Sequence, residues 1–244
     1  AGILESGEWC ETDRGTPQGA GISPLLANVF LHYVLDLWVQ QWRRRRARGR
    51  VVIVRYADDF VMGFEKTDDA RRMMAALTER LAKFGLAIHD EKTRLIEFGR
   101  LPALARRQRG LRRPETFAFL GFTHYCGWTR DGRFIVKLKT QSKRLTRKLK
   151  ALRQEAWRLM HVPLAVQHRW YTSVLLGHYG YYGRPQNFPA LIAFRQEVLR
   201  IWLTCLRRRS QKTRRMSWQT FAALLTSFPL PTPRITHPWT VRAA

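Results

Sequence analysis

The chain has 244 residues, and 45% of them are hydrophobic, which is enough to bury the core of one large domain or two smaller ones. Lys and Arg total 44 against 18 Asp and Glu, so the formal net charge is +26. This composition excludes a disordered acidic chain, and no apolar run reaches the length of about 20 residues that a membrane-spanning helix needs. We therefore expect nucleic acid as the partner and no membrane.

Three cysteines, Cys10, Cys126 and Cys205, are too far apart in the sequence for a Cys-x-x-Cys metal pair or a disulfide framework. They are typical of buried thiols in a reducing compartment, so we expect a cytoplasmic protein. No clustered Cys or His pairs follow the tail, which argues against a zinc nuclease at the carboxy-terminal end.

The first recognisable element is a loop over residues 14–24 that holds three glycines and two prolines. Glycines let a backbone approach a ligand closely because they carry no side chain. Ser23 and Pro24 then predict a helix start, and a run of Arg with Gly49 predicts its end near residue 46. The apolar residues between them recur at helical spacing: Leu25, Leu26, Val29, Phe30, Tyr33, Val34, Leu37 and Trp38.

Two adjacent acids, Asp58 and Asp59, lie between two short runs with strand composition, 51–56 and 60–64. This pattern predicts a β-hairpin with both carboxylates at its tip. Adjacent carboxylates repel each other unless a cation lies close by, and a hard divalent metal is the natural candidate. The alternative is an ordinary solvated turn, because Asp is a common turn residue.

After the hairpin, the sequence predicts a helix from Thr67 to Gly85, two short strands around a polar turn over 86–98, and a strand over 117–125. Between these strands lies a predicted loop with six arginines. They have no compensating acid before Glu115, so we expect contacts with phosphates, although a plain solvated surface is the alternative. The arginines are Arg100, Arg106, Arg107, Arg109, Arg112 and Arg113.

From about Lys137 the pattern becomes helical and more basic. Helices are predicted near 143–159, 165–182 and 188–208, and dense prolines from Pro229 predict an extended strap over this bundle. The overall expectation is an α+β fold with domains at 1–136 and 137–228 and a Pro-rich tail at 229–244. A basic face of the first of these helices is predicted to bind RNA: Lys143, Arg144, Arg147, Lys148 and Lys150.

Several motifs occur in a fixed order along the chain. They are Arg14-Gly-Thr-Pro-Gln-Gly19, Ile22-Ser-Pro-Leu-Leu-Ala-Asn28, Tyr56-Ala-Asp-Asp59, Gly85-Leu-Ala-Ile-His-Asp-Glu-Lys92-Thr93 and Phe119-Leu-Gly-Phe122, followed by Gly180-Tyr-Tyr-Gly183, Leu206-Arg-Arg-Arg-Ser-Gln-Lys212 and Pro233-Arg-Ile-Thr-His-Pro238. In this order the chain resembles reverse transcriptases of the group II intron maturase type over essentially its whole length.

The resemblance implies a partial right-hand polymerase palm, an antiparallel sheet with helices, followed by an all-α thumb or maturase bundle. It implies RNA-directed DNA polymerase activity with Mg²⁺, or Mn²⁺ in its place, on Asp58 and Asp59. It also implies that Pro17, Gln18, Gly19, Tyr56 and Ala57 contact the nucleotide or template, and that Lys92 assists departing pyrophosphate; a solvated surface Lys is the alternative. The implied partners are group II intron RNA, an RNA template with a DNA primer, and deoxynucleoside triphosphates.

The chain departs from the family pattern at its start, where the fingers region and an upstream metal-binding Asp are not found. The acids Glu8, Glu11 and Asp13 belong to the approach of the Gly-rich loop. We therefore expect that the chain is the carboxy-terminal portion of a reverse transcriptase and that it polymerises poorly by itself. The alternative function is a noncatalytic maturase that binds intron RNA and assists splicing.

Overall fold

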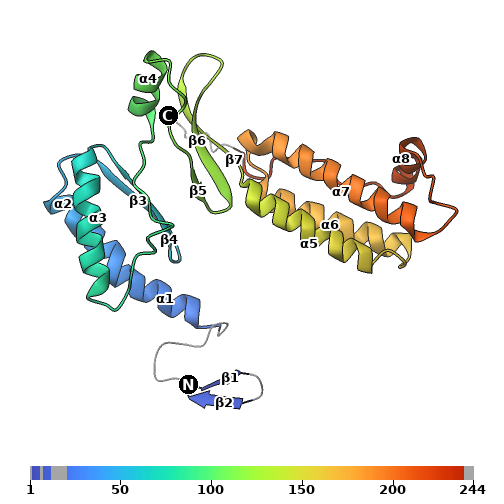
Figure 1. Cartoon of the computed structure of the whole chain (residues 1–244), viewed down its shortest axis with the longest axis horizontal. Coiled ribbons are helices and arrows are strands. Elements are labelled where there is room, and N and C mark those ends of the chain that lie inside the picture. Colours follow the sequence, from blue (N-terminus) through green and yellow to red (C-terminus); the bar gives the residue numbers. More distant parts are fainter. Residues whose placement is uncertain (1, 6–7, 12–20, 239–244) are drawn as a thin grey trace. The chain divides into compact units, whose positions relative to one another are not determined.

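The computed structural model describes residues 2–5, 8–11 and 21–238, with side chains from residue 21 onward. The chain divides into two compact units, an N-terminal unit that ends at Ile96 and a C-terminal unit that begins at Glu97. The N-terminal unit starts with an antiparallel strand pair, β1 (Gly2–Glu5) and β2 (Glu8–Glu11). Figure 1 shows the elements of both units in chain order.

The predicted helix after the Gly-rich loop is confirmed, but a π-helical segment interrupts it. Helix α1 (Ser23–Leu31) continues into the π-helix η1 (His32–Asp36) and then into α2 (Leu37–Arg45). Ser23 is the first helical residue, and not the cap that the sequence predicts. Burial begins only at Val34, whereas the apolar residues of α1, such as Leu25, lie exposed within the described part of the chain.

The predicted hairpin is also confirmed. Strands β3 (Val51–Tyr56) and β4 (Asp59–Phe64) pair antiparallel, and Tyr56 lies opposite Asp59. Because side chains alternate along a strand, one face of the hairpin packs on helices and the other stays open. The predicted helix α3 (Thr67–Ala82) joins the same core. That core contains Val34, Leu35, Val39, Trp42, Val51, Met73, Leu77 and Leu81.

Two predictions for the segment between α3 and the next sheet are wrong. Residues 86–98 form no strand and run as irregular backbone with turns. The arginine-rich segment begins as helix α4 (Arg100–Gln108), not as a loop. Arg, Leu and Ala are good helix formers, and Ala103 is buried on the inner side of α4, so helix propensity decided the local structure.

The C-terminal unit contains a three-stranded antiparallel sheet in the order β5 (Phe117–Phe119), β6 (Phe122–Trp128) and β7 (Phe134–Thr140). The single strand predicted over 117–125 is wrong, because Leu120 and Gly121 both have positive φ and form a two-residue hairpin turn. Strand β7 was missed by the sequence prediction.

The predicted helical bundle is confirmed. Helices α5 (Ser142–Arg158), α6 (Leu164–Tyr182) and α7 (Phe188–Arg209) lie side by side in Figure 1, with a short 3₁₀ turn, η2 (Pro185–Asn187), before α7. Helix α8 (Trp218–Ser227) follows, and the Ser217 hydroxyl accepts a hydrogen bond from the Thr220 amide at 3.1 Å, as a helix cap does. No described helix has the length and apolar character that crossing a bilayer requires.

A buried polar group joins two helices of this bundle. Gln167 is 2% exposed, and its amide nitrogen donates to the Met160 and Val162 carbonyls, at 3.0 Å each. Its amide oxygen accepts a hydrogen bond from the Trp202 indole at 2.9 Å. All the hydrogen-bonding atoms of this side chain therefore have partners inside the bundle.

We expect Gln167→Leu to lower the free energy of unfolding by about 1–3 kcal/mol, because the buried Trp202 N–H loses its acceptor. Urea unfolding measures this value. Gln154→Leu on the exposed surface of α5 is the control and is expected to have little effect. Equal losses of unfolding free energy in the two variants would contradict a stabilising role for the buried Gln167 hydrogen bonds.

The predicted strap is confirmed for the described part of the tail, which runs without helix from Pro229 to Pro238. The Tyr179 hydroxyl and the Arg195 guanidinium both donate to the Pro231 carbonyl, at 3.3 and 3.1 Å. Farther along, the Thr236 hydroxyl donates to the Tyr179 carbonyl at 2.8 Å. The strap therefore packs on the end of α6 through backbone carbonyls.

Gly183 permits this close packing. A Cβ atom at this position would lie 2.3 Å from the Thr236 hydroxyl oxygen and 2.4 Å from the Tyr179 carbonyl oxygen. We expect Gly183→Ala to cost about 1–3 kcal/mol by overpacking and to speed tryptic cleavage after Arg234 in the strap. A Cβ at Gly180 meets nothing within 4 Å, so Gly180→Ala serves as the control. Unchanged cleavage in Gly183→Ala would show that the strap does not depend on this contact.

Candidate active site

The candidate site is the tip of the β3–β4 hairpin. The loop consists of Ala57 and Asp58 alone, because Tyr56 and Asp59 already pair across the strands. Ala57 has a φ of 54°, a left-handed conformation that is uncommon for a residue with a Cβ. Asp58 is therefore a loop residue, whereas Asp59 is the first residue of β4, so the prediction that both acids belong to the turn is corrected for Asp59.

Both acids are exposed, and neither carboxylate has a hydrogen bond or ion pair with any residue whose side chain the structure describes. Alternation along the strands places Asp59 on the open face of the hairpin together with its cross-strand neighbour Tyr56. Tyr56 as a residue is 66% exposed. The site thus presents two unneutralised carboxylates beside an accessible aromatic ring.

These two carboxylates suit a magnesium ion. Mg²⁺ keeps several waters and is usually bound through one or two carboxylates together with substrate phosphates. A dedicated protein cage is not needed, and within the described residues no group of three or more His, Cys, Asp or Glu gathers that could form one. Asp58 and Asp59 could hold a divalent ion of this kind together with substrate phosphates.

Three residues that the sequence analysis did not assign converge behind the loop. Arg55 on β3 donates to both carboxylate oxygens of Asp36, at 2.8 and 2.6 Å. It also donates to the side-chain oxygen of Asn28 at 2.9 Å and to the Ala57 carbonyl at 2.8 Å. Hydrogen bonding to Arg55 lowers the pKa of Asp36 against the opposing effect of burial, so this acid stays ionised.

Of the other residues predicted to contact the nucleotide, template or pyrophosphate, the structure describes only Lys92. Lys92 is exposed in the irregular segment after α3, where its amide donates to the His89 carbonyl at 3.1 Å. Pro17, Gln18 and Gly19 lie outside the described residues. Their predicted role, like that of Lys92, remains a prediction.

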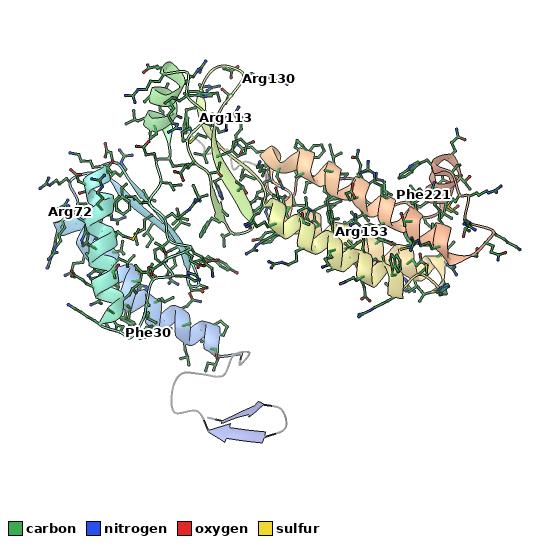
Figure 2. All side chains as sticks on the ribbon, in the orientation of Figure 1. Phe30, Arg72, Arg113, Arg130, Arg153 and Phe221 are labelled. Atoms are coloured by element: carbon green, nitrogen blue, oxygen red, sulfur yellow. The ribbon has the colours of Figure 1, made fainter. Side chains whose placement is uncertain are left out.

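The arginines assigned to RNA binding in the α4 region differ in their contacts. The Arg106 guanidinium donates to the Arg112 carbonyl at 2.8 Å, and the Arg107 guanidinium lies 5.1 Å from the centre of the Trp128 ring. Both side chains therefore stabilise the local fold. The other three, Arg109, Arg112 and Arg113, are exposed, and Figure 2 labels Arg113 in this region.

The basic residues on α5 also differ. Lys143, Arg144 and Arg147 are exposed. Lys148 is exposed as well, but its ammonium lies 3.3 Å from Nδ1 of His178, which is 1% exposed and stacks on Phe194. Burial, together with the nearby Lys148 charge, lowers the pKa of His178 to about 3, so this imidazole is neutral and accepts from the ammonium.

Comparison with protein families gave a match in the N-terminal part of the chain. Residues 4–124 match the family model for reverse transcriptase (RNA-dependent DNA polymerase), and this span contains both acids, the hairpin and α4. A comparison with curated proteins gave no match. Helices α5 to α8 lie outside the matched span. The hairpin that carries Asp58 and Asp59 thus lies within residues 4–124, the segment that matches the reverse transcriptase family model.

Proposed function

We propose that the chain is part of an RNA-directed DNA polymerase of group II intron type. The observation that carries this proposal is the pair of exposed, unpartnered carboxylates at a hairpin tip inside a reverse transcriptase domain. In this proposal residues 1–136 are a partial palm, 137–228 are the thumb or maturase bundle, and 229–244 are the tail. The substrates are a primer on an RNA template and deoxynucleoside triphosphates.

The proposed chemistry needs little from the protein beyond positioning and charge. Asp58 and Asp59 would hold Mg²⁺, which would supply stabilisation of the charge on the attacking and leaving oxygens. The nucleotide or template is contacted by Tyr56 and Ala57 and by the residues of the Gly-rich loop, Pro17, Gln18 and Gly19. Lys92 offers a cation to the departing pyrophosphate.

A second candidate function is noncatalytic binding of intron RNA that assists splicing. It is favoured by the basic helical bundle, which lies outside the matched domain and exposes Lys143, Arg144 and Arg147. Such a protein needs the bundle but not the carboxylates. The two functions therefore differ in their dependence on the acids.

Primer extension distinguishes the two functions. The protein encoded by the reading frame that contains this sequence is supplied with an RNA template, a DNA primer, deoxynucleoside triphosphates and Mg²⁺. We expect template-dependent DNA synthesis that stops when Mg²⁺ is chelated and resumes when it is restored. RNA binding and splicing without any DNA synthesis under these conditions would refute the polymerase and favour the second function.

A further inference from the structure

Arg55 is the centre of a polar cluster behind the acidic loop. Its side chain is only 13% exposed, and each of its three guanidinium nitrogens donates to oxygens fixed by the fold. The Asp36 contact is a bidentate fork, the strongest arrangement that a guanidinium makes with a carboxylate. The remaining nitrogen, Nη1, is shared between the Asn28 side chain and the Ala57 carbonyl.

The π-helical segment helps Asn28 and Asp36 to reach the same guanidinium. In a regular α-helix of 3.6 residues per turn, side chains eight positions apart differ by about 80° around the axis. The wider turns of η1, which ends at Asp36, reduce this difference. Such π segments are frequent at functional sites, and here the segment turns an ion-pair partner toward the hairpin.

The hydrogen bond from Arg55 to the Ala57 carbonyl connects the polar cluster with the two acids. The Ala57 carbonyl belongs to the peptide group that joins Ala57 to Asp58, so a hydrogen bond from Arg55 fixes the plane of that peptide. Ala57 adopts its left-handed φ against a steric cost, and such conformations persist only where surrounding contacts determine them. Arg55 supplies such a contact on the side of the loop opposite the open face.

We propose that Arg55 is a positioning residue: held by Asp36 and Asn28, it fixes the Ala57–Asp58 peptide so that the Asp58 and Asp59 carboxylates keep the geometry that binds a divalent ion. This inference rests on the proposed function of the two acids. The ionised Asp36 neutralises the guanidinium, so Arg55 orients the loop without competing with the cation. Arg55 itself touches neither metal nor substrate.

Arg55→Lys tests the proposal because lysine keeps the positive charge but cannot form the fork. We expect kcat for primer extension to fall by about 10–100-fold, as it does when groups that orient metal ligands are lost, with KM for the nucleotide changed by less than about twofold. In the 244-residue chain, the Kd for Mn²⁺ is expected to weaken over the same range. Amide hydrogen exchange at Asp58 and Asp59 is expected to become faster.

Arg72→Lys is the matched control. Arg72 also pairs with an aspartate of the N-terminal unit, Asp69, which in turn accepts the amides of Arg48 and Gly49 at 2.8 Å each. That pair serves the loop before β3 and has no contact with the hairpin tip among the described residues. The control is expected to leave kcat and Mn²⁺ binding within about twofold of the wild type.

Four results would overturn the inference or show that the loss has another cause. Equal losses in Arg55→Lys and Arg72→Lys would show that general stability, not loop geometry, is affected. Unchanged kcat and Mn²⁺ binding in a folded Arg55→Lys would refute the role of Arg55 alone. Unchanged Mn²⁺ binding in Asp58→Asn would refute the proposed function itself. If Arg55→Lys does not fold, Asn28→Ala removes one acceptor and keeps the ion pair, and a normal kcat in that variant would equally refute the positioning cluster.

Discussion

Asp58→Ala is expected to lower RNA-templated DNA synthesis by about 10³-fold, with RNA binding unchanged. The ion that we propose for these acids would contribute several kcal/mol of transition-state stabilisation, and each 1.36 kcal/mol corresponds to a factor of ten in rate. Single-turnover primer extension in the protein that contains the chain measures the effect on the chemical step. The loss should appear in the single-turnover rate constant and not in the affinity for the template.

Asp68→Ala is the control for this experiment. Asp68 is another exposed acid of the N-terminal unit, but it lies in the first turn of α3, where its charge only favours the helix dipole. We expect it to cost about 0.3–1 kcal/mol of stability and no activity. Synthesis that survives Asp58→Ala would contradict the assignment of the catalytic acids.

RNA binding is expected to weaken steeply with salt, on the order of 10³–10⁵-fold between 50 and 200 mM if 6–10 phosphates are contacted. Each neutralised phosphate releases counterions, so the slope of log Kd against log salt reports the number of contacts. Filter binding or fluorescence anisotropy over this range measures the slope. An affinity that stays flat across the titration would refute phosphate recognition.

Substitutions of two pairs of basic residues on α5 test whether this helix contacts the RNA phosphates. Lys143 and Arg147 are exposed and have no acidic partner among the described residues, so replacing both by Gln should reduce the slope by about one unit or more. Arg153 and Arg158 already face Glu197 and Glu155, at 3.7 and 3.3 Å, and serve as the control. Figure 2 labels Arg153 on this helix. Equal reductions by both pairs would mean that only total charge matters.

Local patterns in the sequence predicted much of the fold. The hairpin followed from β-branched runs on either side of a turn, and α3, α5, α6 and α7 followed from apolar residues at helical spacing. These elements form from residues that are close together in the sequence, so the residue pattern of each segment predicts them. The role of the two acids stays a prediction, because Asp is a common turn residue and only the ordered motifs around the acids indicated a metal site.

The failures have physical causes. Residues 86–98 have strand composition but no strand partner among the described residues, and a strand depends on partners that sequence spacing does not reveal. Gly121 was placed inside a strand because its positive φ cannot be read from the sequence. Arg55 was missed because a single Arg on a strand shows no pattern, and its partners Asn28 and Asp36 lie 27 and 19 residues away.

Binding of Mn²⁺ to the 244-residue chain, followed by paramagnetic broadening of backbone amide signals, tests the metal site at the hairpin most directly. We predict that the signals of Asp58 and Asp59 broaden at the lowest Mn²⁺ concentration and that the effect disappears when both acids are replaced by Asn. Broadening centred on other acids, with the hairpin signals unaffected, would contradict the proposed metal site at Asp58 and Asp59.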